Sequence, residues 1–153
     1  MRDPAVRVTS AVAALPLPAT RLARLASAAL RRMTHRPVAV GLVVLDDPAI
    51  RRLNRRFLGH DCATDVLAFR LQPETAGRMP GALFGEVYVS ASTAVREARK
   101  RGIAPAEELL RYAIHGMLHL FGHDDRRPAD RRRMWARQEA LVRCARIAGK
   151  PSP

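Results

Sequence analysis

The chain has 153 residues, 48% of them hydrophobic and 27% charged, a composition that fits one globular domain and excludes a disordered chain. Its net charge is +13, from 27 Lys and Arg against 14 Asp and Glu. Such an excess attracts polyanions, of which RNA and an anionic membrane are the candidates. Arginine usage in a GC-rich genome explains the kind of cation but not the excess, so we favour a nucleic acid partner.

The cysteines and the first residues bear on location. Cys62 and Cys144 lie far apart and form no CxxC pair, which favours a reducing compartment. The N-terminal apolar stretch faintly resembles a signal peptide, but prolines break it and a charged helix follows. No apolar run approaches the length of a membrane span. We therefore expect a soluble, cytoplasmic protein with no membrane contact.

Hydrophobic periodicity and turn residues predict the elements in chain order. They are a strand at 6–9, an amphipathic helix at 19–33, a buried strand at 38–45, a helix capped by Asp46 or Asp47, a strand at 65–69, a loop at 71–82, a strand at 84–90, a helix from Ser90 or Ser92 to Gly102, a helix at 105–121, and a last helix at 128–147. Together they predict an α+β fold, with mixed α/β as the alternative. Residues 1–153 would form one domain, a mixed sheet of about four strands packed with about five helices.

Two helices carry large apolar side chains whose burial can be predicted. Ile50, Leu53 and Phe57 recur at helical spacing and are expected to point inward. Met134 and Trp135 in the last helix are expected in the core rather than on an RNA-stacking platform. Aromatic residues make up only 5% of the chain, so we expect RNA to be recognised by backbone charge and shape.

The stretch 115–125, HGMLHLFGHDD, carries the chemistry. His115 and His119 are four apart, so on a helix they project from the same face and can share one metal ion. Gly122 permits a left-handed turn that ends the helix. Asp125 or His123, after that turn, can then complete a set of three ligands with positions open for substrate.

The alternative is that two histidines stand four apart by chance, and for a bare HxxxH that alternative would be preferred. Here a helix-ending glycine and acidic residues follow at the spacing that a third ligand needs, which favours the metal site. The motif is not the HExxH of a gluzincin-type protease, because Gly116 stands where that motif has its general base.

This stretch resembles the HGxLHLxGxDH signature of the YbeY family of bacterial endoribonucleases and rRNA maturation factors. Further blocks resemble that family in the same order: residues 53–54 (LN), residues 61–69 (DCATDVLAF), residues 84–90 (FGEVYVS), and Met134 in the last helix. The resemblance runs from about residue 38 to 140.

The resemblance implies a single-domain enzyme with a zincin-like metal helix. Its activity would be that of a zinc-dependent, single-strand-specific endoribonuclease in ribosomal RNA processing, with the 3′ end of 16S rRNA as the expected region. It also implies one zinc ion on His115, His119 and Asp125, and the small ribosomal subunit as a partner.

The sequence departs from the family pattern at four positions. Asp125 stands where the family has its third histidine, and we prefer it to His123 because it holds the family position. Its charge would leave the metal a weaker Lewis acid than three histidines would. Leu58 replaces an arginine, which puts one phosphate contact in doubt. Glu86 for aspartate and Ala63 for proline are mild changes.

Several weaker assignments complete the prediction. Asp124 either orients a histidine or is a turn residue, with equal weight. Thr64 and Asp65 are expected to cap and start a strand rather than touch the site. The arginines expected along the RNA path are Arg51, Arg55, Arg56 and Arg70. The rival functions are another metallohydrolase, acting on peptides or small molecules, and a ribosome-assembly or RNA-binding factor with weak or no catalysis.

Overall fold

The computed structural model describes residues 3–58, 65–71 and 83–150, which form four strands and five helices. In chain order these are β1 Ala5–Ser10, α1 Ala19–Met33, β2 Ala39–Leu45, α2 Asp47–Leu58, β3 Val66–Arg70, β4 Leu83–Ser90, α4 Ala91–Arg101, α5 Pro105–Leu120 and α6 Pro128–Ala148. The predicted α+β fold is confirmed, and the strands and helices begin and end within about one residue of the predicted bounds. The predicted loop lies outside the described residues from residue 72 onward.

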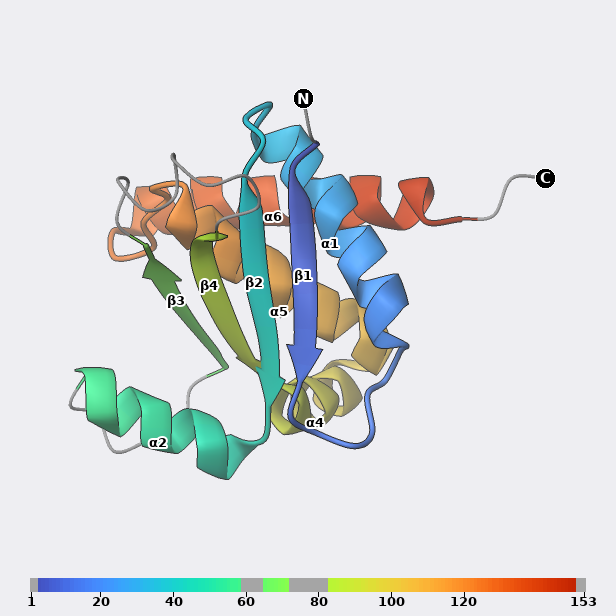
Figure 1. The fold of residues 1–153 in the computed structure, drawn as a ribbon, viewed down its shortest axis with the longest axis vertical. Helices are drawn as coiled ribbons and strands as arrows, with labels where there is room; N and C mark the ends of the chain where they lie inside the picture. The colour runs from blue at the N-terminus through green and yellow to red at the C-terminus, as the bar shows by residue number, and fades with distance from the viewer. Residues whose placement is uncertain (1–2, 59–64, 72–82, 151–153) are drawn as a thin grey trace.

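The four strands form one mixed sheet in the order β1-β2-β4-β3. β1 pairs with β2 and β2 with β4 in parallel, whereas β3 pairs with β4 in the antiparallel sense. Parallel neighbours need a crossover connection, and α1 supplies the one between β1 and β2. Figure 1 shows α1, α5 and α6 together behind the sheet, while α2 lies apart from them at one end.

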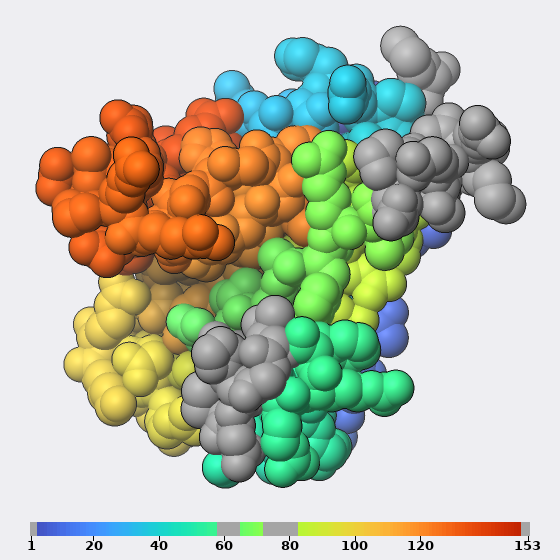
Figure 2. Space-filling view, turned by 90° about the vertical axis from the view of Figure 1, so that its left-hand side faces the viewer, coloured from blue at the N-terminus to red at the C-terminus, as the bar shows by residue number. Residues whose placement is uncertain are grey.

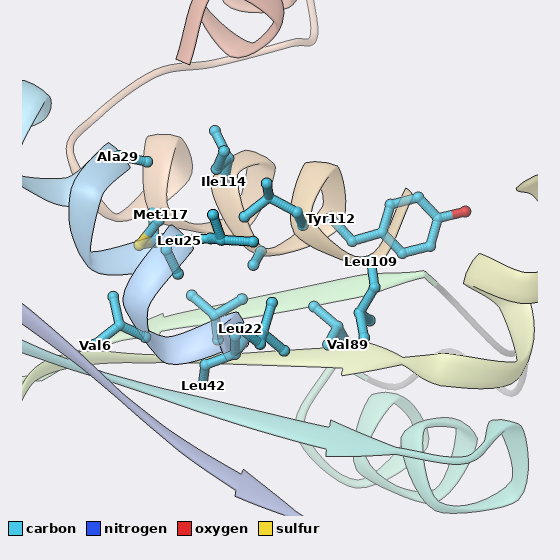
Figure 3. Packing of buried hydrophobic residues seen from close by; sticks show 14 of the residues in the cluster. Val6, Leu22, Leu25, Ala29, Leu42, Val89, Leu109, Tyr112, Ile114 and Met117 are labelled. Atoms are coloured by element: carbon cyan, nitrogen blue, oxygen red, sulfur yellow. The ribbon is translucent and has the colours of Figure 1, made fainter. Parts of the chain in front are cut away.

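Alternation along the strands creates two apolar faces. Val40, Leu42 and Val44 of β2 face the helices behind the sheet. Val43 and Leu45 of the same strand join a smaller cluster on the other face, where α2 packs. Successive strand side chains point to opposite faces, so the continuous apolar run of β2 fits a strand covered on both sides. Figure 3 shows the larger cluster, with the side chains of α1 and α5 meeting those of the strands.

Helix α5 is the centre of the larger cluster. Ala104 precedes it in an extended conformation, Pro105 opens it, and Glu107 and Glu108 lie in its first turn, where the positive end of the helix dipole favours acidic side chains. It packs against α1, α4, α6, β3 and β4, and most of its side chains are buried. Its last turn is therefore held rigidly by the rest of the fold.

Helix caps follow the predicted chemistry. The main-chain nitrogen of Ala49 donates to Asp46 Oδ1 at 2.9 Å, so Asp46 caps α2. Ser90 caps α4, because its hydroxyl accepts from the main-chain nitrogen of Thr93 at 3.2 Å. Gly102 follows α4 with φ +67°, a conformation that glycine adopts without a steric penalty.

Two burial predictions are wrong. Ile50 is fully buried, but Phe57 is 57% exposed, because it lies in the last turn of α2, where it touches Phe69 edge-on rather than entering the core. Met134 is buried, whereas Trp135 is 50% exposed. Consecutive residues of a helix point about 100° apart, so a buried Met134 turns Trp135 away from the core.

Among the described residues, no helix is both long and apolar enough to cross a lipid bilayer.

Candidate metal centre

The two histidines of α5 point to a common place at the end of the helix. Their side chains are each 31% exposed, and the two Nε2 atoms lie 3.2 Å apart. After the helix, Gly122 has φ +92°, and its nitrogen donates to the His119 carbonyl at 3.1 Å. This left-handed turn redirects the chain, as the sequence predicted, and brings Asp125 back toward the rings.

Asp125 supplies a third donor atom. Its Oδ2 lies 3.7 Å from His115 Nε2 and 3.6 Å from His119 Nε2. A point equidistant from the three atoms is about 2.0 Å from each, which is the length of a zinc–nitrogen or zinc–oxygen bond. The cluster could therefore hold a metal ion without any movement of its side chains.

Hydrogen bonds on the far side of each ring favour the tautomer whose hydrogen is on Nδ1. Nδ1 of His115 donates to Gln138 Oε1 at 2.8 Å, and Nδ1 of His119 donates to the main-chain oxygen of His123 at 3.1 Å. In the neutral rings Nε2 then carries no hydrogen, so two lone pairs and a carboxylate oxygen converge. That convergence is unfavourable unless a positive charge lies between the atoms, and this fits a cation site.

The environment also favours the neutral, metal-binding form of His119. Burial lowers the pKa of His119, and the neighbouring His115 lowers it further, against the opposing effect of Asp125. A lowered pKa keeps the imidazole unprotonated at neutral pH, which is the form that coordinates a metal.

A chain of hydrogen-bonded polar groups, partly buried, lies behind His115. Gln138, 2% exposed, donates from Nε2 to Glu139 at 3.2 Å. Arg111 holds Glu139 with two hydrogen bonds of 2.8 and 2.9 Å and also donates to Glu108 at 2.9 Å. Arg101 closes the chain with a 2.9 Å bond to the other oxygen of Glu108. Because every member has partners, the Gln138 amide oxygen is held toward His115.

Sequence reasoning did not find this chain of contacts. Glu108 and Arg111 are three apart on one helix, a spacing that allows an ion pair, and that was the available signal. Gln138 and Glu139 come from α6, 23 or more residues further along, and no local pattern places them beside α5.

The structure distributes the other predicted site residues away from the cluster. His123, the alternative third ligand, contributes its main-chain oxygen to His119. Asp124 accepts from the nitrogen of Arg126 at 3.1 Å, as a turn residue does. The main-chain oxygen of Asp65 accepts from the nitrogen of Ser90, which places Asp65 at the start of β3.

The arginines expected along the RNA path are exposed on α2 and at the end of β3: Arg51, Arg55, Arg56 and Arg70. The remaining predicted positions lie outside the described residues: Cys62, Ala63, Thr64 and the side chain of Leu58.

A cleft of about 550 Å³ opens beside His115. Residues of α4, α5 and α6 line it, together with the first residues of β3. Figure 2 shows the hollow between α4 (yellow) and the orange segment that leads into α6, with α5 behind. Of the three donor residues, His115 lines this open cleft, and such access is typical of a catalytic metal centre rather than of a closed structural one.

Comparisons with known proteins place this class of site in a family. The family model described as "Endoribonuclease YbeY" matches residues 13–145. The chain therefore belongs to the YbeY family, as the sequence motifs predicted.

Individual relatives agree with this assignment. The endoribonuclease YbeY of Anaeromyxobacter sp. (strain Fw109-5) is 42% identical over 131 residues, 86% of this chain and 67% of the relative. The relative from Myxococcus xanthus is 45% identical, and the match covers 69% of this chain and 36% of the relative. The relative from Geobacter sulfurreducens is 33% identical, and the match covers 89% of this chain and 92% of the relative. The matches thus span about two thirds or less of the first two relatives.

A solved structure shares the fold. A Thermotoga maritima protein, whose solution structure is known, is 26% identical to this chain in sequence. The superposition covers 92% of this chain and 88% of the Thermotoga protein, with a TM-score of 0.64.

Proposed function

We propose that this chain is a zinc-dependent endoribonuclease that hydrolyses phosphodiester bonds in single-stranded ribosomal RNA. His115, His119 and Asp125 would hold one zinc ion. The observation that carries the proposal is the convergence of three candidate donor atoms around a point about 2.0 Å from each, beside an open cleft that His115 lines. The names of its relatives, endoribonuclease YbeY, supply the reaction class.

The chemistry at this site follows from the donor set. Bound here, the ion would supply Lewis acidity toward a phosphoryl oxygen and lower the pKa of an attacking water. Asp125 brings a negative charge that three histidines would not, which moderates this acidity. His115, His119 and Asp125 would hold the ion, and the cleft that His115 lines would give a strand access to it.

The charge of the molecule supports an RNA substrate. A net charge of +13 concentrates a polyanion around the protein. We propose ribosomal RNA of the small subunit as this polyanion, with the 3′ end of 16S rRNA as the region cleaved and the cytoplasm as the location.

RNA cleavage with matched variants tests the function. Purified protein should contain about one zinc per chain and cleave a single-stranded RNA but neither duplex RNA nor casein, and a chelator should abolish cleavage. His119→Ala should lose both metal and cleavage. Cleavage that survives the chelator would contradict the proposal. Ribosome binding without stoichiometric metal, unchanged by His119→Ala, would favour an assembly factor instead.

A pair of substitutions tests the third ligand. Asp125→Ala removes a donor atom and should weaken zinc binding strongly, by about 10²-fold or more. His123→Ala should change zinc affinity little, because His123 contacts His119 through a main-chain oxygen that any residue retains. Competition with a chromophoric chelator measures both affinities. The reverse order of effects would assign the third position to His123.

A further inference from the structure

Two aromatic side chains line the cleft, and Trp135 is the exposed one, because Tyr112 is buried. It is 50% exposed and lines the same cleft as His115. Trp135 and Gln138 are three apart on α6, so they are neighbours on the helix surface, and Gln138 contacts His115 directly. The indole therefore lies about one helical turn from a residue that touches the metal centre.

Arg101 holds a fixed place beside this indole. Its guanidinium carbon lies 5.9 Å from the Trp135 ring centroid, and its Nη1 donates to the buried Glu108 at 2.9 Å. Because Glu108 is 1% exposed and also binds Arg111, it anchors the Arg101 side chain. The cleft thus presents a planar aromatic surface with a planar cation near it, before any ligand enters.

The charge lining the cleft differs from that of the whole molecule. The described residues that line it include three arginines, which are Arg96, Arg101 and Arg111, and three acidic residues, which are Asp65, Glu97 and Glu108. These charges balance, whereas the chain as a whole carries +13. A cleft lining without net charge attracts a phosphate only weakly, but it can accept an uncharged, planar ring with hydrogen-bonding edges. A nucleobase has these properties.

We propose that this cleft is a base-binding subsite, in which one nucleobase of a single-stranded RNA stacks on Trp135 beside Arg101. This inference rests on the proposed function, because it takes the RNA strand at the metal centre as its ligand. The base belongs to a nucleotide adjacent to the phosphate that lies at the metal centre. A cleft of about 550 Å³ has room for a base and its ribose. A base paired in a duplex cannot leave its stack without an energetic cost, so the subsite favours single strands.

The chain contains one tryptophan and two tyrosines, so emission excited selectively from tryptophan comes from Trp135 alone. The zinc-loaded protein is mixed with a ten-nucleotide adenylate RNA or with an abasic strand of the same length. Emission is recorded by stopped flow before cleavage products form. The adenylate strand should quench the emission, and the abasic strand should bind through its phosphates without comparable quenching. Equal quenching by both strands, or no quenching by a bound adenylate strand, would overturn the proposal.

Substitutions separate stacking from a structural role. Trp135→Ala should weaken binding of the adenylate strand about 5- to 100-fold and leave binding of the abasic strand unchanged, whereas Trp135→Phe should restore most of the loss. Ile147→Ala is the matched control, because Ile147 is a 68% exposed apolar residue on the same helix, about 18 Å further along. It should alter neither affinity. Equal losses for both strands, or no loss for Trp135→Ala, would overturn the subsite.

The failure of this inference can be told from the failure of the proposed function. Metal-dependent cleavage by the wild-type protein, together with unchanged adenylate binding by Trp135→Ala, would refute the subsite and leave the nuclease standing. Base-dependent quenching without any cleavage would refute the nuclease and leave a base-binding cleft.

Discussion

The two histidine rings are held by different kinds of acceptor. His119 donates to the main-chain oxygen of His123, a group that no side-chain substitution removes. His115 donates to the side chain of Gln138 on another helix. The orientation of His115 is therefore the part of the site that one distant residue controls, and Gln138 acts there as a positioning residue.

Replacing Gln138 should weaken the metal site without touching a ligand. Gln138→Ala removes the acceptor for His115 Nδ1 and should lower zinc affinity about 10- to 100-fold. Gln138→Glu keeps an acceptor oxygen and should retain more affinity than the alanine variant, although it places a second carboxylate near Glu139. Chelator competition measures the affinities, and the absorption spectrum of bound cobalt reports on ligand geometry. If folded Gln138→Ala protein binds zinc as tightly as the wild type does, Gln138 does not position His115 for metal binding.

At the scale of elements, α5 packs tightly against the sheet at Gly116. A Cβ atom at Gly116 would lie 2.3 Å from Val87 Cγ1 and 2.9 Å from Val66 Cγ1. Val87 is fully buried, so it has little room to move. The absence of a side chain at Gly116 thus sets the distance between the sheet and the helix that carries both histidines.

Gly116→Ala should destabilise the protein although alanine is the better helix former. Overpacking costs about 1–3 kcal/mol, and helix propensity returns about 1 kcal/mol, so we expect a net loss of up to about 2 kcal/mol in urea unfolding. Adding Val87→Ala removes the clashing methyl groups, so the double variant should lose less than the sum of the single variants. If the stability losses of the two single variants simply add in the double variant, contact with Val87 is not the cause of the destabilisation by Gly116→Ala.

Helices α2 and α4 are joined through one carboxylate. Asp47, in the first turn of α2, accepts hydrogen bonds from Ser90, from Thr93 at 2.7 Å and from Arg96 at 2.8 Å. Burial acts to raise the pKa of Asp47, but the hydrogen bonds from these three residues outweigh it and lower the pKa to about 2 from the ordinary 3.8. The ionised form is therefore the one that links the helices.

This shift predicts how stability depends on pH. Because the folded pKa lies below the unfolded one, the Asp47 contribution is fully present above about pH 4 and is lost as pH falls toward 2. Asp47→Asn should cost about 1–2 kcal/mol at pH 6, after allowance for partial exposure. Denaturant unfolding of metal-free protein measures this. The difference in free energy of unfolding between the wild-type protein and Asp47→Asn should become small near pH 2. A difference that does not change with pH would contradict a stabilising role for ionised Asp47.

At the scale of the whole molecule, we expect charge and cleft to divide the recognition of an RNA strand. The excess of arginine would attract the phosphates from a distance, whereas the cleft beside His115 is lined by balanced charges. We expect affinity to come mainly from phosphate contacts and the preference for an unpaired base from Trp135.

Salt separates these two contributions. The logarithm of RNA affinity should fall linearly with the logarithm of salt concentration, by about 0.7 per phosphate neutralised on a single strand. Three such contacts would weaken binding by roughly tenfold or more between about 50 and 200 mM salt. Trp135→Ala should lower the RNA affinity at every salt concentration without changing the slope of this dependence. Arg55→Ala should make the slope shallower if Arg55 contacts a phosphate. Fluorescence anisotropy of a labelled strand gives both quantities, and a slope near zero would contradict binding by charge.

Much of the candidate site could be predicted from the sequence because its signals are local. His115 and His119 share one helix, and Gly122 with Asp125 follows within six residues. Periodicity and turn chemistry therefore predicted the histidine pair and left Asp125 or His123 as the third donor, and the resemblance to the family motif favoured Asp125. The preference for Asp125 over His123 agrees with the geometry, since Asp125 Oδ2 lies beside both rings. Trp135 was expected in the core, and the structure places it half exposed at the cleft instead.

The sequence by itself determined the order and bounds of the elements, the two histidine donors of the candidate metal site, and two candidates for the third donor. Each of these depends on residues within a few turns of one another, where backbone geometry leaves few alternatives. Only the tertiary structure decided that Gln138 orients His115, that Arg111 and Glu139 hold Gln138, and that Trp135 faces the cleft. Those contacts join separate helices, and the packing of α6 against α5 and the sheet selects which of its faces meets the site.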